Sequence, residues 1–163
     1  MQKINILFVA FLLTTNVFSQ NLPFISVVKE KRSEDETAVK AVVEQFLKAS
    51  GNYDVAAMRS LLLPNANIGW HSLKEGKWMP LSITAESYFE SITKRVNPKP
   101  YTEPVSTYTI HISEGRLAFV QADAILSREG QAKAHNMDFF ILMKENAVWK
   151  FLSGSFTSVP IKD

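Results

Sequence analysis

The sequence predicts a domain of the α+β class, in which helices cover one face of an antiparallel sheet. Between residues 33 and 96 the apolar residues recur with helical spacing, whereas from residue 105 onward apolar and polar residues alternate as they do in strands. The segments that join the expected strands are short, which favours antiparallel pairing of consecutive strands. We therefore expect a group of helices followed by a sheet that they cover.

Length and composition indicate one globular domain. The 163 residues are 46% hydrophobic and 21% charged, which is typical of a chain that buries a core. The net charge is +2 and the basic residues are scattered, so nucleic-acid binding has little electrostatic support. Without cysteine the chain can form neither disulfides nor a lipid-modified cysteine.

The N-terminus is typical of a secretory signal peptide. Lys3 precedes a short apolar stretch, and Ser19 is small enough for the position before a cleavage site. We expect a signal peptide at 1–19, a leader at 20–33 and a folded domain at 34–159. After cleavage the protein would be exported, either to the periplasm or to the medium, with no membrane span.

Three helices are expected in the first part of the domain. The first begins at Ser33, which opens a Ser-x-x-Glu capping-box pattern, and ends at Gly51. The second runs from Asp54 to Pro64, and the third begins at Thr84. Their apolar faces are expected to comprise Val39, Val43, Phe46, Met58, Tyr88, Phe89, Ile92 and Val96.

Six strands are expected. Two short strands flank the Lys-Glu-Gly-Lys turn within residues 65–79. Four longer strands follow, with Glu-Gly or Asn-Ala in each connecting turn. They cover 105–112, 116–126, 135–144 and 148–156, and the turns lie at Glu114-Gly115, Glu129-Gly130 and Asn146-Ala147.

The last hairpin carries the most specific pattern, "MDFFILMKENAVWKFLSGSF" at 137–156. An aspartate, an apolar strand, a lysine, a turn and then Trp-Lys-Phe resemble the ending of the lumazine-binding branch of the nuclear transport factor 2-like (SnoaL-like) superfamily. The order of elements over 34–159 is similar to the same superfamily. One departure is Ala147, where that branch usually has glycine.

The resemblance implies a cone-shaped fold, with three N-terminal helices packed on a curved antiparallel sheet. It also implies a pocket at the open end of the cone and a homodimer formed through the outer sheet face. The same fold hosts isomerases, dehydratases, cyclases, binding proteins and dimerisation modules, so it does not by itself decide the function.

Asp138 is the main candidate site residue, because an ionised carboxylate is costly to bury in an apolar strand. A two-residue turn at Asn146-Ala147 places it opposite Ser155, on the face that carries Phe140 and Trp149. A face that changes from apolar to polar suits a small apolar or aromatic ligand. The candidate ligand-binding residues are Asp138, Trp149, Phe140, Ser155, Tyr88, Trp70 and His71, and Phe156 is expected on the opposite face.

Two interpretations of Asp138 stay open. Burial would raise its pKa and suit it to general acid or base chemistry, or it accepts hydrogen bonds from Ser155 and backbone amides and only stabilises the sheet. A second strand aspartate, Asp123, lies either on the same face or on a solvated one. The three histidines lack metal-ligand spacing, and no cofactor motif is present, so we expect no metal and no cofactor.

Three functions are therefore compatible with the sequence. The first is an exported, non-catalytic domain that binds a small molecule in one apolar pocket. The second is a cofactor-free isomerase, dehydratase or cyclase that uses Asp138 as general acid or base, and the third is a pocketless dimerisation or interaction domain.

Overall fold

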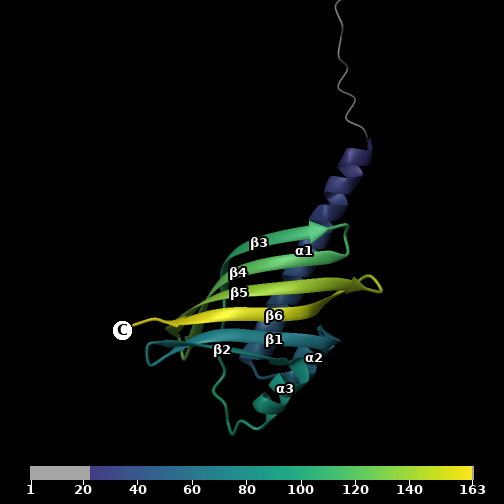
Figure 1. Ribbon diagram of the computed structural model, residues 1–163. Coiled ribbons are helices and arrows are strands. Elements are labelled where there is room, and N and C mark those ends of the chain that lie inside the picture. The colour runs from purple at the N-terminus through teal and green to yellow at the C-terminus, as the bar shows by residue number, and fades with distance from the viewer. Residues whose placement is uncertain (1–22, 163) are drawn as a thin grey trace, which may run out of the picture.

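A long helix crosses one face of a curved six-stranded sheet, and two short helices lie at one end of the sheet (Figure 1). This computed structural model describes residues 23–162, without the side chains of 23–31 and 33. The α+β class is confirmed, whereas the predicted signal peptide at 1–19 lies outside the described residues. Within the described part of the chain, no helix is long and apolar enough to cross a membrane.

The long helix α1 (Pro23–Gly51) begins well before Ser33, so the predicted start was wrong. Residues 23–33, predicted as a leader, belong to this helix. Proline suits the first position of a helix, and the Lys, Arg and Glu residues that follow favour helical conformation. The Ser-x-x-Glu pattern therefore lies inside the helix and does not mark its start.

The two short helices begin where the sequence predicts. The first, α2 (Val55–Ser60), is capped by Asp54, whose side chain accepts a hydrogen bond from the amide of Ala57 at 2.9 Å. The second, α3 (Ala85–Thr93), is capped by Thr84 in the same way. Each cap satisfies an amide that the first turn of a helix leaves unpaired.

Both helices end earlier than predicted. Pro64 lies in strand β1 (Leu62–Lys74), so α2 gives way to a strand before it reaches this residue. Val96 lies beyond α3 and is 87% exposed, so its predicted burial was wrong. Pro98 disfavours helical conformation at the residue before it, which limits how far α3 could extend.

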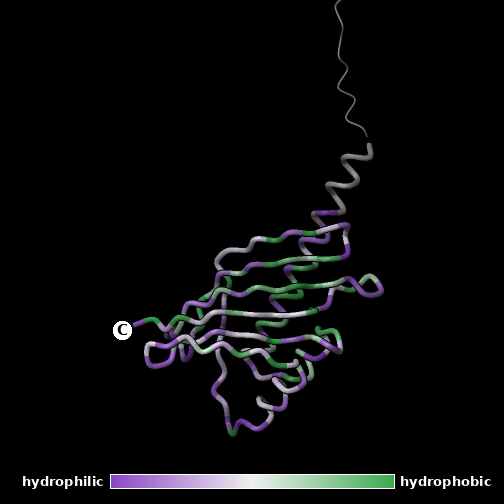
Figure 2. The backbone as a smooth tube through the Cα atoms, in the orientation of Figure 1, coloured by the Kyte–Doolittle hydropathy of each residue, from purple (hydrophilic) through white to green (hydrophobic). Residues whose placement is uncertain are grey.

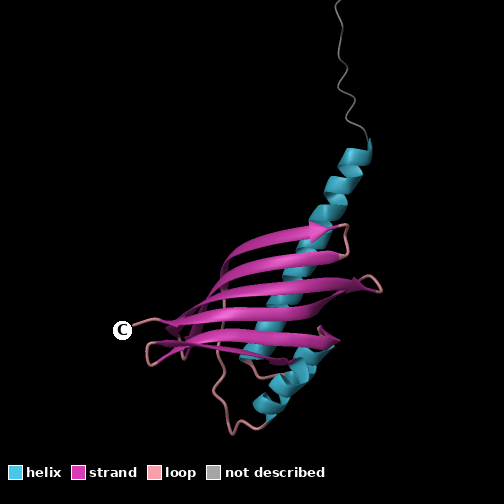
Figure 3. Cartoon of the chain, in the orientation of Figure 1, coloured by secondary structure: helices cyan, strands magenta, loops and turns pink. Residues whose placement is uncertain are grey.

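The sheet, whose strands are magenta in Figure 3, has the strand order β2-β1-β6-β5-β4-β3, as the labels in Figure 1 show. The predicted turns and the antiparallel pairing of consecutive strands from β3 to β6 are confirmed. The prediction that the whole sheet is antiparallel was wrong, because β1 pairs with β6 in parallel. A parallel pair requires a long crossover connection. The remaining strands are β2 (Lys77–Thr84), β3 (Val105–Ser113), β4 (Leu117–Arg128), β5 (Gln131–Glu145) and β6 (Val148–Pro160).

A bulge in β6 changes the register of the last hairpin. Leu142 pairs with Phe151 as predicted, but the next pair is Ile141 with Ser153, so Leu152 has no partner of its own on β5. An extra residue in one strand moves all later side chains of that strand to the other face. Asp138 is therefore opposite Phe156, and the predicted pairing of Asp138 with Ser155 was wrong.

The core lies between α1 and the face of the sheet that it covers, which we call the inner face. Val39, Val43 and Phe46 of α1 are at most 7% exposed. The ring of Phe46 packs against Phe140 and Phe151, with centroids 6.2 and 4.8 Å away. Figure 2 shows hydrophobic and hydrophilic residues alternating along the strands, as expected when one face is buried.

The last turn of α1 touches the loop that enters β3. The amide of Tyr101 donates to the carbonyl of Gly51 at 3.0 Å, and the hydroxyls of Ser50 and Tyr101 are 2.6 Å apart. A Cβ atom at Gly51 would overlap the carbonyl oxygen of Tyr101. Glycine is thus needed here for close approach, and its backbone conformation is ordinary.

Replacing Gly51 with alanine is expected to lower the free energy of unfolding by about 1–3 kcal/mol, the usual cost of overpacking. The backbone at Tyr101 would have to move, and this outweighs the gain of about 1 kcal/mol in helix propensity. Urea denaturation of the two proteins measures the difference. A stabilised variant, as helix propensity alone predicts, would contradict the close contact.

Candidate functional site

A small cavity of about 70 Å³ lies between α1 and the inner face of the sheet. Two polar side chains of β5, Asn136 and Asp138, line it and are each 2% exposed. The other lining residues come from α1, β1, α3, the loop before β3, β5 itself and the two strands beside it. They are Phe46, Leu47, Ser50, Ile68, Tyr88, Tyr101, Glu103, Leu126, Phe140, Gly154 and Phe156.

The strand register explains why Asp138 faces the cavity. Asn136, Asp138 and Phe140 alternate with exposed or half-buried residues along β5, so all three lie on the inner face. Across the sheet, Asp138 is flanked by Phe156 of β6 and by Ala122 of β4.

A second carboxyl group, that of Glu103, reaches the cavity from the loop before β3. Asn136 donates a hydrogen bond from its side-chain amide to the Glu103 carboxylate. Burial raises the pKa of Glu103, and this hydrogen bond opposes the rise. The cavity therefore holds two carboxyl groups, and no lysine, arginine or histidine is among the described residues that line it.

The environment of Asp138 disfavours its ionised carboxylate, which lacks a counter-charge and, at Oδ2, a hydrogen-bond donor among the described cavity residues. Burial, and then the nearby charge of Glu103, raise the pKa of Asp138 to about 8. Its Oδ2 atom and the Oδ1 atom of Asn136 are buried without a hydrogen-bond partner among the described residues. Orphaned buried polar atoms are uncommon in native proteins, and a bound molecule would satisfy these two.

Three hydroxyl groups complete the polar part of the cavity. Tyr101 and Ser50 are hydrogen-bonded to each other, and Tyr88 of α3 lies on the same wall. Burial raises the pKa of both tyrosines, so their hydroxyls keep their protons at neutral pH and can donate hydrogen bonds. The cavity thus offers neutral hydroxyl donors as well as carboxyl groups.

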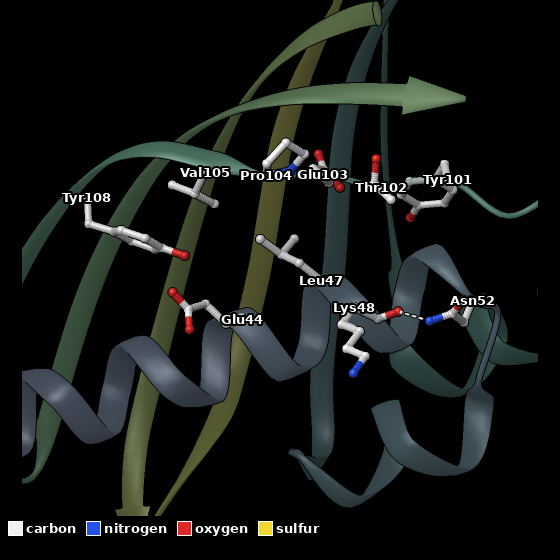
Figure 4. Close-up of a pocket in the computed structure, with 10 residues that line it drawn as sticks. All are labelled: Glu44, Leu47, Lys48, Asn52, Tyr101, Thr102, Glu103, Pro104, Val105 and Tyr108. Carbon is white, nitrogen blue, oxygen red and sulfur yellow. Dashed lines mark hydrogen bonds between the residues drawn. The ribbon is translucent and has the colours of Figure 1, made fainter. Parts of the chain in front are cut away.

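A larger open groove of about 690 Å³ lies outside the cavity (Figure 4). It runs between α1 and the segment from Tyr101 to Tyr108, and Glu44 and Tyr108 point toward each other across it (Figure 4). Leu47, Tyr101 and Glu103 line both spaces. These three side chains form the wall between the groove and the cavity, and we call them the dividing wall.

The structure groups some of the predicted site residues and separates others. Asp138, Phe140 and Tyr88 line the cavity. Trp70 stacks on Phe156 with centroids 6.1 Å apart and meets Tyr88 edge-on at 6.2 Å, so it supports two lining residues. Phe156 faces the cavity and not the opposite face, because of the bulge in β6.

Three predicted residues lie elsewhere. Ser155 and His71 line an open depression of about 390 Å³ that also includes the outward-facing Phe139. Trp149 is buried at the other end of α1, where its indole NH donates to Asp35 at 3.3 Å. These positions do not place Ser155, His71 or Trp149 at the cavity.

Asp123 does not share a face with Asp138. It pairs with Met137 in the sheet, so its side chain projects from the outer face, and its carboxylate lies 2.7 Å from Nε2 of His135. The question that the sequence left open is thus answered by the register. Among the described residues, no group of three His, Asp or Glu side chains could hold a metal ion.

Sequence reasoning did not find Glu103, Tyr101 or Ser50. The segment "NPKPYTEP" at 97–104 only indicates a break in regular structure. Its position depends on tertiary contacts, namely the Tyr101–Gly51 hydrogen bond and a backbone bridge between Thr102 and Ser127. A carboxylate between prolines is the only local signal, and it is a weak one.

Residues 34–157 match the family described as "Putative lumazine-binding". The chain belongs to this family. The match spans most of the chain and includes both Glu103 and Asp138, and it confirms the predicted superfamily and branch. No curated protein sequence matches the chain.

Solved structures with the same fold are similar to this lumazine-binding family member. An NTF2-like protein with a cystatin-like fold from Novosphingobium aromaticivorans has a TM-score of 0.66 at 9% identity, covering 85% of this chain and 91% of that chain. An NTF2-like protein of unknown function from Shewanella baltica has a TM-score of 0.60 at 18% identity, covering 79% and 97%. A protein described as "Putative Scytalone Dehydratase", also from N. aromaticivorans, has a TM-score of 0.61 at 11% identity, covering 80% and 88%. At these identities the similarity shows the fold alone.

Proposed function

We propose that this protein binds a small molecule at the cavity that contains Asp138. The observation that carries the proposal is a pair of buried oxygen atoms, Oδ2 of Asp138 and Oδ1 of Asn136, which have no hydrogen-bond partner among the described residues and belong to residues that line the cavity. A desolvated polar atom without a hydrogen bond costs about 1–3 kcal/mol, and a ligand that supplies donors would recover this cost. The family description, which refers to lumazine binding, also favours a small ligand.

The size of the cavity determines how such a ligand would fit. A volume of about 70 Å³ is small beside the roughly 150 Å³ cavity that accommodates benzene in an engineered protein. A ligand with one or two rings would therefore occupy the cavity with one end and the groove with the other. For this to happen, the dividing wall of Leu47, Tyr101 and Glu103 has to move aside.

A specific observation also favours a second candidate function, a cofactor-free isomerase, dehydratase or cyclase. The pKa of Asp138, about 8, keeps this carboxyl group mostly protonated at neutral pH, and a second carboxyl group lies nearby. General acids and bases work best when their pKa is close to the ambient pH. Asp138 would transfer the proton, and Tyr88 or Tyr101 would donate a hydrogen bond to the reacting oxygen.

Identification of a co-purified compound tests the binding function. The full-length protein is purified, extracted and analysed by mass spectrometry beside Asp138→Asn and Asp123→Asn. We expect the wild type and Asp123→Asn to retain the same compound and Asp138→Asn to lose it, because Asp123 projects from the other face of the sheet. Equal retention by all three proteins would count against the site.

The same samples separate binding from catalysis. When the extracted compound is added back to the purified protein, a binding protein returns it unchanged. An enzyme converts it to an isomer or a dehydrated product, and Asp138→Asn abolishes the conversion while Asp123→Asn does not. Conversion by Asp138→Asn at the wild-type rate would exclude Asp138 as the acid or base.

We also propose that the protein is exported and forms a homodimer through the outer face of the sheet. Support for a dimer comes from the large apolar side chains Phe139, Met143 and Leu152, which are 37–42% exposed on that face. A second copy of the chain would cover them. Light scattering at micromolar concentration is expected to give twice the chain mass, and a monomer would exclude this dimer.

A further inference from the structure

The cavity has an unusual charge composition. Two of its polar side chains, Asp138 and Glu103, are acids, and none of the described lining residues carries a positive charge. Two buried carboxylates without a counter-charge cannot both ionise cheaply, because each disfavours the charge of the other. In the empty protein the pair therefore retains at least one proton at neutral pH.

Two of the three buried atoms that have no hydrogen-bond partner among the described residues belong to residues that line the cavity, and the third is the hydroxyl of Tyr108 at the groove. Oδ2 of an ionised Asp138 and Oδ1 of Asn136 are both hydrogen-bond acceptors, and both are buried at the cavity. Asn136 belongs to no acidic pair, and its other atom, Nδ2, already donates to Glu103. Oδ1 of Asn136, which is an acceptor whatever the protonation state of the two acids, thus independently indicates a ligand that brings N–H or O–H donors.

We propose that the cavity is selective for a planar cationic nitrogen group, such as an amidinium or a protonated amino-heterocycle, which donates to Asp138 and Asn136, and that it rejects anions. This inference rests on the proposed binding function and specifies the class of ligand. A cation would supply the missing counter-charge and donors together. A carboxylate or phosphate would instead meet two acids and no base.

The apolar walls are suited to the same group. Aromatic rings of Phe46, Phe140, Phe156, Tyr88 and Tyr101 line the cavity. The faces of aromatic rings attract cations within about 6 Å, and the attraction grows when the cation is desolvated. A planar cation could therefore lie against one of these rings while its N–H groups reach the two acceptors.

Binding of a cation would release a proton. The titratable or charged groups around Asp138 are Glu103, Tyr101 and Tyr88 in the cavity, with Tyr108, Glu44 and Lys48 at the groove. Burial, and then the charges of Glu44 and Asp138, raise the pKa of Tyr108 to about 12, so this tyrosine stays neutral. Since Asp138 titrates near pH 8, affinity for a cation is expected to increase from pH 6 to about pH 8 and then to level off.

A matched series of small probes tests the selectivity. Acetamidinium, acetamide and acetate have nearly the same shape but carry a positive, zero and negative charge. Each is titrated into the full-length protein at about pH 8, the pKa of Asp138, and the backbone amide of Asp138 and the side-chain amide of Asn136 are followed by NMR. We expect acetamidinium to bind about tenfold or more tightly than acetamide, as one pKa unit of charge interaction implies, and acetate to bind more weakly than acetamide.

Three variants show whether the carboxyl pair causes the preference. Asp138→Asn and Glu103→Gln preserve side-chain shape and are expected to reduce the preference for acetamidinium to about threefold or less, whereas Asp123→Asn is expected to leave it unchanged. If acetamide or acetate binds as well as acetamidinium, the inference fails while the binding function stands. If no probe shifts the two amide signals, both the inference and binding at this cavity fail.

Discussion

Replacing Asp138 with asparagine is expected to raise the free energy of unfolding at pH 8 by about 2–4 kcal/mol. The pKa of Asp138 in the folded protein, about 8, is above the ordinary value near 3.8. A carboxyl group of this kind stabilises the folded state fully only below the pKa of the unfolded chain. Its contribution is lost as pH rises toward 8, because the folded protein then has to give up a proton that it holds tightly.

The pH dependence distinguishes this effect from a general change in packing. The stability of the wild type is expected to decrease between pH 5 and pH 8 by at most about 1.4 kcal/mol per pH unit, and that of Asp138→Asn to vary much less. Urea denaturation at several pH values measures both curves. The matched control Asp123→Asn lies on the outer face and is expected to follow the wild type. Parallel curves for the wild type and Asp138→Asn would show that Asp138 is not the titrating group.

The pair of carboxyl groups gives a second test of the same effect. Because burial and then the charge of Glu103 raise the pKa of Asp138, Glu103→Gln is expected to reduce the decrease in stability that Asp138→Asn removes altogether. In detail, the pKa of Asp138 moves down when Glu103 is neutral, so the decrease ends at a lower pH. If Asp138→Asn gains stability and loses the bound compound, Asp138 is a residue retained for function at a cost in stability.

Replacing Asp35 with alanine is expected to lower the free energy of unfolding by about 2–4 kcal/mol. Asp35 of α1 is 7% exposed, forms an ion pair with Lys144 of β5, and accepts a hydrogen bond from the indole of Trp149 at 3.3 Å. Its removal leaves an ammonium group and a buried indole NH without their acceptor. The ammonium of Lys144 also lies 5.0 Å from the centre of the Trp149 ring. Loss of Asp35 would therefore weaken the contacts among all three side chains.

A neighbouring acid on the same helix provides the control. Glu36 pairs with Arg32 at 3.2 Å, but both side chains are exposed, so Glu36→Ala is expected to cost less than about 1 kcal/mol. Chemical denaturation of both variants at neutral pH measures the difference. If Asp35→Ala and Glu36→Ala lower the free energy of unfolding by the same small amount, the ion pair of Asp35 with Lys144 does not stabilise the packing of α1 on the sheet. The double change Asp35→Leu with Lys144→Met is expected to recover most of the loss, since buried ion pairs can be replaced by apolar contacts.

Local patterns were sufficient to predict most elements of the fold. The caps at Asp54 and Thr84 and the turn at Asn146-Ala147 depend on neighbouring residues, and the structure has them where the sequence places them. The same holds for the alternation that directs Asp138 inward along β5. The start of α1 was missed because a capping pattern at Ser33 is compatible with the interior of a helix.

The candidate site was predicted only in part, since it depends on register and on a loop. One extra residue at Leu152 exchanges the faces of Ser155 and Phe156, and no periodicity announces it. Trp70 reaches the same inner face as Asp138 through a parallel pairing of β1 with β6. Glu103 comes from an irregular segment, where a side chain has no direction that sequence spacing could indicate.

The sequence by itself determined the α+β class, the superfamily and the inward direction of one carboxylate, because these follow from short-range spacing and from motifs. Only the tertiary structure decided that this carboxylate has a second acid as its neighbour and a small cavity in front of it. The physical reason is that charge coupling and unpaired acceptors arise between elements far apart in the chain. In this protein Asn136 of β5 contacts Glu103 of the 97–104 loop, and the same loop contacts the end of α1 through Tyr101. These contacts bring the residues of the candidate site together.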